Sequence, residues 1–198
     1  MKVPQYPQYP QYLIDVRHGK KARERISAVG LAEVMKFAGD SLKKVIERLL
    51  RGEIGADGVE MFHGPMVRTA ETLTALRLGF PGLGDVIHDP IELFGDSDLF
   101  TNMKDSGFLD KLKTEGIAVA AATPDGEGYA ELALRGVEQA FDEMKGNVAV
   151  AVGHHPMIPL AAIATGYKFT GEFPELSLVV FKKDDDGTIS VSEVHISA

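Results

Sequence analysis

The residues Arg17, His18 and Gly19 stand directly after the short apolar segment Leu13–Val16. An arginine guanidinium binds a phosphate group through two parallel hydrogen bonds, a geometry that lysine does not match. A histidine with the usual pKa of about 6.5 is largely neutral at pH 7, so one ring nitrogen is free to act as a nucleophile. Glycine lets the backbone come close to an anion. The run therefore indicates either a solvated loop or an anion site that contains a nucleophile.

Basic and acidic side chains also follow three later apolar segments that we expect to be strands: His63 and Arg68 follow Gly58–Phe62, Glu92, Asp96 and Asp98 follow Asp85–His88, and His154 and His155 follow Asn147–Val152. In an open α/β sheet, ligands bind outside the carboxyl ends of the strands. Because all four sets of side chains follow predicted strands, we expect them to converge at one edge of one sheet.

Strands and helices alternate along the chain. Apolar spacing predicts helices over Val29–Leu50, Met66–Leu78, Phe108–Thr114, Gly128–Met144 and Pro156–Thr165, and a last hairpin made of Leu178–Lys182 and Thr188–Ile196. This order predicts a three-layer α/β/α fold with a mostly parallel sheet and a C-terminal antiparallel hairpin at one edge. The stretch from Pro90 to Pro124 is weakly periodic apart from one helix, and long loops of this kind often form lids or substrate walls.

The chain of 198 residues is long enough for one domain with a substantial core, which we expect over residues 12–198. Residues 1–11 carry a Gln-Tyr-Pro repeat that predicts a Pro-rich arm of polyproline II type. An interaction protein that acts through this arm is one functional alternative.

The formal net charge of −8 disfavours a nucleic-acid partner, because binding to a phosphate backbone needs a basic surface. A few arginines in one cleft can still attract a small anion. No apolar run approaches the roughly 18 residues that cross a bilayer, so no membrane association is expected. There is no cysteine and no apolar core of a signal peptide, and we expect the cytoplasm.

Four segments resemble, in chain order, motifs of the histidine phosphatase superfamily. Arg17-His18-Gly19 resembles the family signature, and Ile26–Gly30 resembles its Leu-Thr-x-x-Gly helix start. Pro65–Thr72 resembles its Ser-Pro-x-x-Arg-x-x-Gln-Thr segment, and Val152–Pro156 resembles the turn that carries its second histidine. That turn has the Gly-His-x-Pro form of members similar to phosphohistidine phosphatases. The ordered match runs from Leu13 to the last hairpin. The resemblance implies the phosphoglycerate-mutase-like fold.

Two segments depart from the family pattern. His63-Gly64-Pro65 stands where members usually have Ser-Ser-Pro, so a hydroxyl near the phosphate is replaced. The segment Pro90–Gly95 approximates the family's Leu-x-Glu-x-x-x-Gly, with the glycine one residue closer to Glu92. Glu92 is nevertheless the first candidate for the acid that protonates the leaving group, and Asp96 and Asp98 are the next.

Phosphoryl transfer requires in-line positioning and neutralisation of charge on the phosphate oxygens. Arg17 and Arg68 supply that charge, so neither a metal nor a cofactor is expected. His18 is the predicted nucleophile, and His154 is predicted to donate a hydrogen bond to the transferring group. Further candidates for the substrate pocket are Gly19, His63, Asp96 and His155. A zinc site made of His18, His63, His154 and His155 is disfavoured, because zinc usually also enlists a cysteine or a carboxylate.

The sequence therefore predicts a metal-independent phosphatase that forms a phosphohistidine. The expected partner is a small phosphorylated substrate or a protein that carries phosphohistidine. One alternative is a phosphotransferase of the phosphoglycerate mutase type, which is disfavoured because the Glu-Arg-His-Tyr-Gly segment of that branch is missing. The other is a protein of the same fold that binds phosphate without turning it over.

Overall fold

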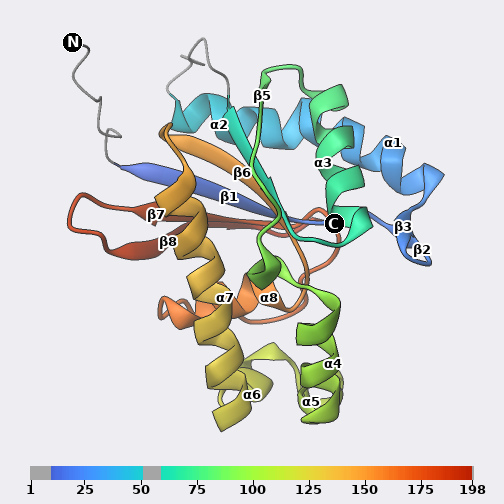
Figure 1. Cartoon of the computed structure of the whole chain (residues 1–198), viewed down its shortest axis with the longest axis vertical. Coiled ribbons are helices and arrows are strands. Elements are labelled where there is room, and N and C mark those ends of the chain that lie inside the picture. Colours follow the sequence, from blue (N-terminus) through green and yellow to red (C-terminus); the bar gives the residue numbers. More distant parts are fainter. Residues whose placement is uncertain (1–9, 51–58, 198) are drawn as a thin grey trace.

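A β-sheet forms the middle layer of the molecule (Figure 1). In the computed structural model, which describes residues 10–50 and 59–197, its strands lie in the order β5-β4-β6-β1-β7-β8. The strands are β1 Gln11–Arg17, β4 Val59–His63, β5 Leu83–Ile87, β6 Val148–Gly153, β7 Leu178–Lys183 and β8 Ile189–His195. The first four in this order are parallel, whereas β7 and β8 form an antiparallel hairpin beside β1. The predicted sheet and its edge hairpin are confirmed.

Helices cover both faces of the sheet, which confirms the three-layer architecture (Figure 1). One face is covered by α1 Ala28–Phe37, α2 Lys43–Leu49 and α3 Val67–Gly79, and the other by α7 Pro124–Glu143 and α8 Met157–Ala164. A π-helical turn, Ala38–Leu42, joins α1 to α2, so the helix predicted over Val29–Leu50 consists of two α-helices with this turn between them. No helix in the described part of the chain is long and apolar enough to span a membrane.

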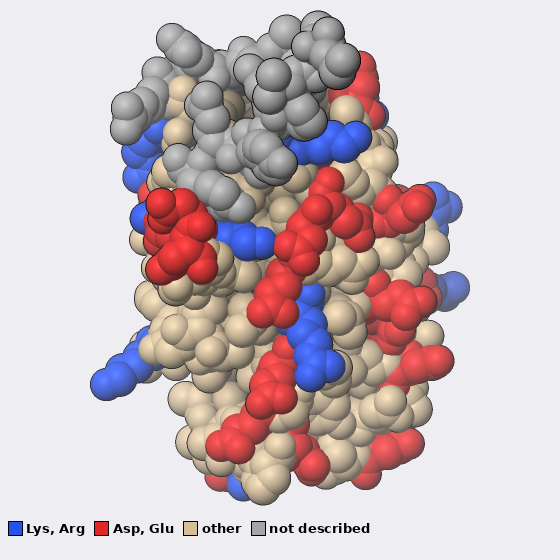
Figure 2. Space-filling model, turned by 60° about the vertical axis from the view of Figure 1, so that its left-hand side comes forward, with Lys and Arg blue, Asp and Glu red and all other residues tan. Residues whose placement is uncertain are grey.

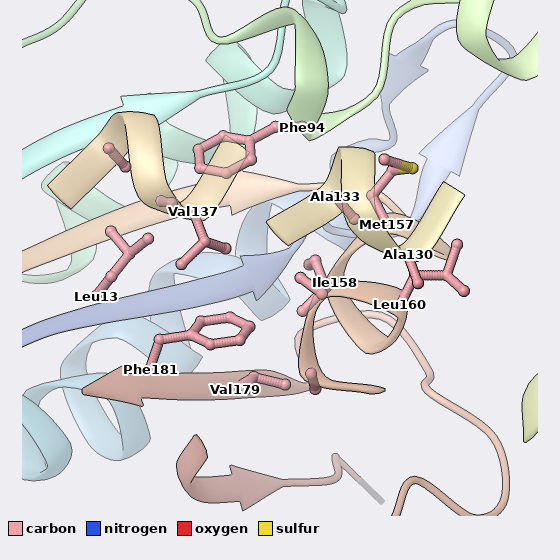
Figure 3. Packing of buried hydrophobic residues seen from close by; sticks show 14 of the residues in the cluster. Leu13, Phe94, Ala130, Ala133, Val137, Met157, Ile158, Leu160, Val179 and Phe181 are labelled. Atoms are coloured by element: carbon pink, nitrogen blue, oxygen red, sulfur yellow. The ribbon is translucent and has the colours of Figure 1, made fainter. Parts of the chain in front are cut away.

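Two apolar clusters hold the layers together, and β1 contributes to both. Leu13 faces the layer of α7 and α8, where it belongs to the same cluster as Val137 and Ile158 (Figure 3). Ile14 and Val16 belong to the second cluster, under α1, α2 and α3. Successive residues of a strand point to opposite faces, so a strand buried on both sides is apolar nearly throughout. This burial fixes the position of β1, so Arg17, its last residue, lies at the edge of the sheet formed by the carboxyl ends of the parallel strands.

The stretch between Pro90 and Pro124 is mostly helical, which corrects the prediction of one helix in a long loop. It contains the 3-10 turn η2 Glu92–Phe94 and the helices α4 Ser97–Asp105, α5 Phe108–Glu115 and α6 Ile117–Ala121. Only α5 was expected from the apolar spacing. The segments η2 and α6 have 3 and 5 residues, which is too short for a helical repeat of apolar residues to be visible. In α4, Met103 is the single buried residue.

Helix α7 begins at Pro124, four residues before the predicted start at Gly128. The Thr123 side chain accepts a hydrogen bond from the Gly126 amide at 3.2 Å and caps the helix. Proline suits the first turn because its missing N–H has no partner there in any helix. The two glycines of the first turns lower the helix propensity, which is why the sequence pattern suggests a later start.

The small hairpin of β2 Lys21–Ala22 and β3 Arg25–Ile26 was not predicted. The predicted arm ends earlier than residue 11, because Gln11 is buried as the first residue of β1 and its side chain donates to the Gly146 carbonyl at 3.1 Å. Residues 1–9 of the arm lie outside the described residues, as does Gly58 of the second predicted strand.

Candidate active site

A pocket of about 310 Å³ lies at the carboxyl edge of the parallel strands. Its polar lining residues are Arg17, His18, Lys21, Arg68, Lys113, His154, His155 and Glu175, and its apolar ones are Phe100, Leu109, Leu112 and Pro156. The structure thus brings together the end of β1, the first turn of α3 and the turn after β6. Side chains that follow three of the four predicted strands thus meet here, whereas the acids that follow Asp85–His88 do not.

His18 lies buried on the pocket floor with one ring nitrogen committed to the backbone. Its Nδ1 is 2.8 Å from the carbonyl oxygen of Gly19, which can only accept, so Nδ1 carries the proton and Nε2 keeps a lone pair. Burial, together with the charges of Arg68 and Arg17, lowers the pKa of His18 to about 4. The imidazole is therefore neutral at pH 7, the form in which a ring nitrogen attacks phosphorus.

Gly19 packs where no side chain fits. A Cβ at this position would lie 2.5 Å from the Val34 side chain of α1, and the Gly19 amide donates to the Thr72 hydroxyl at 3.1 Å. The backbone that holds His18 is thereby clamped between α1 and α3. Gly19 shapes the floor through this packing.

Arg17 is held by the loop that precedes β7. One guanidinium nitrogen donates to the Phe173 carbonyl, and Nη2 is 3.7 Å from the carboxylate of Glu175. Its Nε is buried and has no hydrogen-bond partner among the described residues. Burial lowers the pKa of Arg17, and an arginine still keeps its charge at neutral pH. Arg17 is therefore a fixed cation whose Nε–H is available to donate a hydrogen bond to an anion in the pocket.

Arg68 and His154 are paired in the structure. The Nε of Arg68 donates to Nε2 of His154 at 2.8 Å, and Nδ1 of His154 lies 3.3 Å from the Phe94 carbonyl. Burial, His18 and Arg68 lower the pKa of His154 to about 2, so it is neutral. With Nε2 accepting, His154 has no proton on the pocket side. The predicted donation to a phosphoryl group requires Nε2 to take up a proton and to release Arg68.

Several predicted residues do not line the pocket. Glu92 is exposed in η2, because the turn directs Ile91 and Phe94 into the core instead. Asp96 caps α4 by accepting from the Leu99 amide at 2.6 Å. Asp98 is exposed in the first turn of α4.

The two remaining histidine candidates have different positions. His63 is half-buried at the end of β4, with Nδ1 2.7 Å from the Gly64 carbonyl, and it is not a lining residue. His155 is a lining residue, and burial together with the charge of Arg17 lowers its pKa to about 4. In the described ranges, no group of three or more His, Cys, Asp or Glu is placed to hold a metal ion.

The charge of the pocket is opposite to that of the chain. Among the described lining residues, Arg17, Arg68, Lys21 and Lys113 are cations and Glu175 is the one carboxylate. The whole chain has a formal net charge of −8, and acidic side chains run across the face seen in Figure 2. Cations focused in a cleft on an acidic protein select for a small anion over an extended polyanion.

No known protein-family profile and no curated protein matches the chain. Solved structures do match. Phosphoglycerate mutase from Bacillus anthracis str. Sterne is 17% identical with a TM-score of 0.61, over 93% of this chain and 92% of that chain. Bacillus stearothermophilus YhfR is 16% identical with a TM-score of 0.63, over 95% and 98%. The chain has the phosphoglycerate-mutase-like fold. The protein histidine phosphatase SixA, solved with tungstate, is 16% identical with a TM-score of 0.51, over 94% and 97%.

The phosphoglycerate-mutase-like fold is the one that the sequence resemblance implies, so this prediction is confirmed. The fold also explains which lining residues the sequence did not reveal. Because β7 runs antiparallel to β1, its first residues lie at the edge where β1 ends, and Glu175 stands just before it. The predicted C-terminal hairpin therefore contained the information that could have placed Glu175 at the pocket. The stretch between Pro90 and Pro124 was expected to form a lid or a substrate wall, but its sequence pattern did not show that Lys113, Phe100, Leu109 and Leu112 face the pocket.

Proposed function

We propose that this chain is a metal-independent phosphatase that works through a phosphohistidine at His18. The observation that supports it most is the state of His18, a buried neutral imidazole with its Nδ1 proton on a carbonyl and its Nε2 lone pair directed away from that bond. Two arginines line the same pocket. A nucleophile beside two guanidiniums suits transfer of a phosphoryl group.

The first step binds a phosphate monoester dianion against Arg17 and Arg68. Nε2 of His18 attacks phosphorus, the bond from phosphorus to the leaving oxygen breaks, and the electron pair departs with that oxygen. The charge on the equatorial oxygens stays neutralised by the two guanidiniums throughout. The ring of His154, centred 4.8 Å from that of His18, accepts a hydrogen bond from Nε of Arg68 and holds this guanidinium beside the nucleophile.

The second step releases the phosphate. A water oxygen attacks phosphorus, the bond to Nε2 breaks, and its electron pair returns to the imidazole. Glu175 is placed to accept a proton from this water, because it is the carboxylate of the pocket among the residues that the structure describes. Glu92 is not proposed as an acid, because its side chain faces solvent outside the pocket. The substrates proposed are a small phosphate ester or a phosphohistidine on a protein.

The test is hydrolysis of p-nitrophenyl phosphate in the presence of a chelator, by the native protein, by His18→Ala and by the control His195→Ala. His195 lies on β8, away from the pocket lining. We expect turnover that resists the chelator, survives in His195→Ala and falls by at least about 1,000-fold in His18→Ala.

A second measurement detects the intermediate itself. A native sample quenched in alkali during turnover of phosphorus-labelled substrate should retain label on His18, and His18→Ala should retain none. Turnover that persists in His18→Ala, or that the chelator abolishes, would refute the mechanism. Binding of inorganic phosphate without any turnover would instead favour the non-catalytic alternative.

A further inference from the structure

The pocket has an apolar wall next to its cationic floor. Phe100 comes from α4, and Leu109 and Leu112 come from α5. The Phe100 ring meets the His154 ring edge-on, with 5.6 Å between their centres, so the wall begins where the floor ends. These residues bind no phosphate oxygen, because they carry no hydrogen-bond donors. They are placed to contact the group that carries the phosphate.

The pocket measures about 310 Å³, and Phe100, Leu109 and Leu112 line it together with the two arginines. The phosphate and the group that carries it would therefore share one pocket.

No carboxyl group in the described lining is placed to protonate a leaving oxygen. Glu175 is the one carboxyl group of the described lining, and it is held in an ion pair with Arg17, 3.7 Å from Nη2. His154 and His155 are neutral at pH 7, because burial lowers their pKa values to about 2 and about 4. Lys21 and Lys113 add positive charge, which stabilises an anion in the pocket. An alkoxide leaves poorly without a strong acid, whereas a phenol, with a pKa of about 10, leaves readily as its anion.

Resting on the proposed function, we infer that the substrate carries its phosphoryl group on an aromatic ring, at a phenol oxygen or an imidazole nitrogen. The ring packs against Phe100, Leu109 and Leu112 while the phosphate lies on the arginines. Attack by Nε2 of His18 breaks the bond between phosphorus and the ring atom, and the electron pair leaves with the ring. A phenol leaves as its anion and then takes a proton from solvent, whereas a phosphoimidazole takes that proton on its other ring nitrogen beforehand and leaves as neutral imidazole. Water then cleaves the phosphohistidine, leaving one proton on the phosphate and passing the other through Glu175 to solvent.

The experiment compares three ring substrates of similar size on the native protein: phenyl phosphate, phosphoimidazole and cyclohexyl phosphate. Cyclohexyl phosphate fills the same volume but leaves as an alkoxide. We expect kcat/KM for phenyl phosphate or phosphoimidazole to exceed that for cyclohexyl phosphate by at least about 100-fold. The reason is that an alkoxide needs a general acid to leave, and such an acid contributes a factor of at least about 100 to the rate. The faster of the first two identifies the source, a phenol or an imidazole. Equal or faster turnover of cyclohexyl phosphate overturns the inference.

Variants test the wall separately. Leu112→Asn should lower kcat/KM for phenyl phosphate by about tenfold through a higher KM, with inhibition by inorganic phosphate unchanged. The control Val119→Asn exchanges an exposed valine of α6 outside the pocket and should change neither value. An unchanged KM in a folded Leu112→Asn contradicts the role of the wall. The substrate comparison on the native protein decides the inference even where a variant folds poorly.

The outcomes separate this inference from the proposed function. If none of the three compounds is hydrolysed, or if His18→Ala hydrolyses all three as well as the native protein does, the proposed function fails. If all three are hydrolysed with His18 required and without preference for the aromatic rings, the proposed function stands and the substrate class fails.

Discussion

Asp15 is a buried carboxyl group whose protonation should govern how stability changes with pH. It lies in the middle of β1 with 1% of its surface exposed, and its Oδ1 has no hydrogen-bond partner within the described residues. Burial raises its pKa from 3.8 to about 8. The folded protein therefore holds this group as a neutral acid at pH 7, two residues before Arg17.

The sign follows from the two states. Below pH 3.8 the carboxyl is protonated in both states, and its contribution to stability is fully present. As the pH rises, the unfolded chain releases the proton first, so stability falls until the folded pKa of about 8 is passed. Each pH unit in this window costs about 1.4 kcal/mol, so on the order of 4 kcal/mol is lost between pH 4 and pH 7. This is a large share of the roughly 5–15 kcal/mol that stabilises a domain.

The perturbation is Asp15→Asn, which keeps the shape and cannot ionise. Urea unfolding at pH 4.5, 6, 7 and 8.5 should show that the variant gains stability relative to the native protein as the pH rises, and that the gain levels off above pH 8. Contributions of other groups cancel in this difference. The control Asp105→Asn replaces an exposed carboxyl at the end of α4 and should give a flat difference. A flat difference for Asp15→Asn as well would refute the reasoning.

Three further predictions concern the pocket and α7. Glu175→Gln removes the carboxylate beside Arg17, so inorganic phosphate should bind about threefold more tightly in calorimetry. Replacement of the exposed Glu172 by Gln is the control. Weaker binding in Glu175→Gln would contradict the prediction and show that the carboxylate mainly holds Arg17 in place. Gly128→Ala should raise the free energy of unfolding by about 0.5–1 kcal/mol, because nothing lies near a Cβ there. Gly126→Ala should lower the free energy of unfolding by at least about 2 kcal/mol, because the Cβ would lie 2.1 Å from the Ala120 carbonyl oxygen. Equal effects of the two alanine substitutions would contradict the packing of α6 on α7. The pocket histidines His18, His154 and His155 have lowered pKa values, so the stability that they contribute is present above pH 6.5 and is lost as the pH falls toward 4. Urea unfolding of Asp15→Asn should show this loss, and saturating phosphate should reduce it.

Much of the pocket floor could be predicted, because strand ends and residue types carry the information. Arg17, His18, Arg68 and His154 were expected at one edge, and they line one pocket. Glu92 was expected there as well and faces solvent instead. The sequence places an acid near this edge of the sheet, but the turn of η2 decides which side chain points inward. Burial of Ile91 and Phe94 stabilises the fold, whereas burial of an unpaired carboxylate costs free energy.

The amino-acid sequence by itself determined the layer architecture, because apolar periodicity and turn residues are local signals. It also determined that a guanidinium, an imidazole and a glycine end the first strand. Only the tertiary structure decided the protonation of His18, the pairing of Arg68 with His154, and the pairing of Arg17 with Glu175. These depend on burial and on contacts between residues far apart in the chain, such as those 86 positions apart in the Arg68 pair. The tertiary structure also decided the apolar wall, because the side chains of α4 and α5 that face the pocket depend on how these short helices pack against the core.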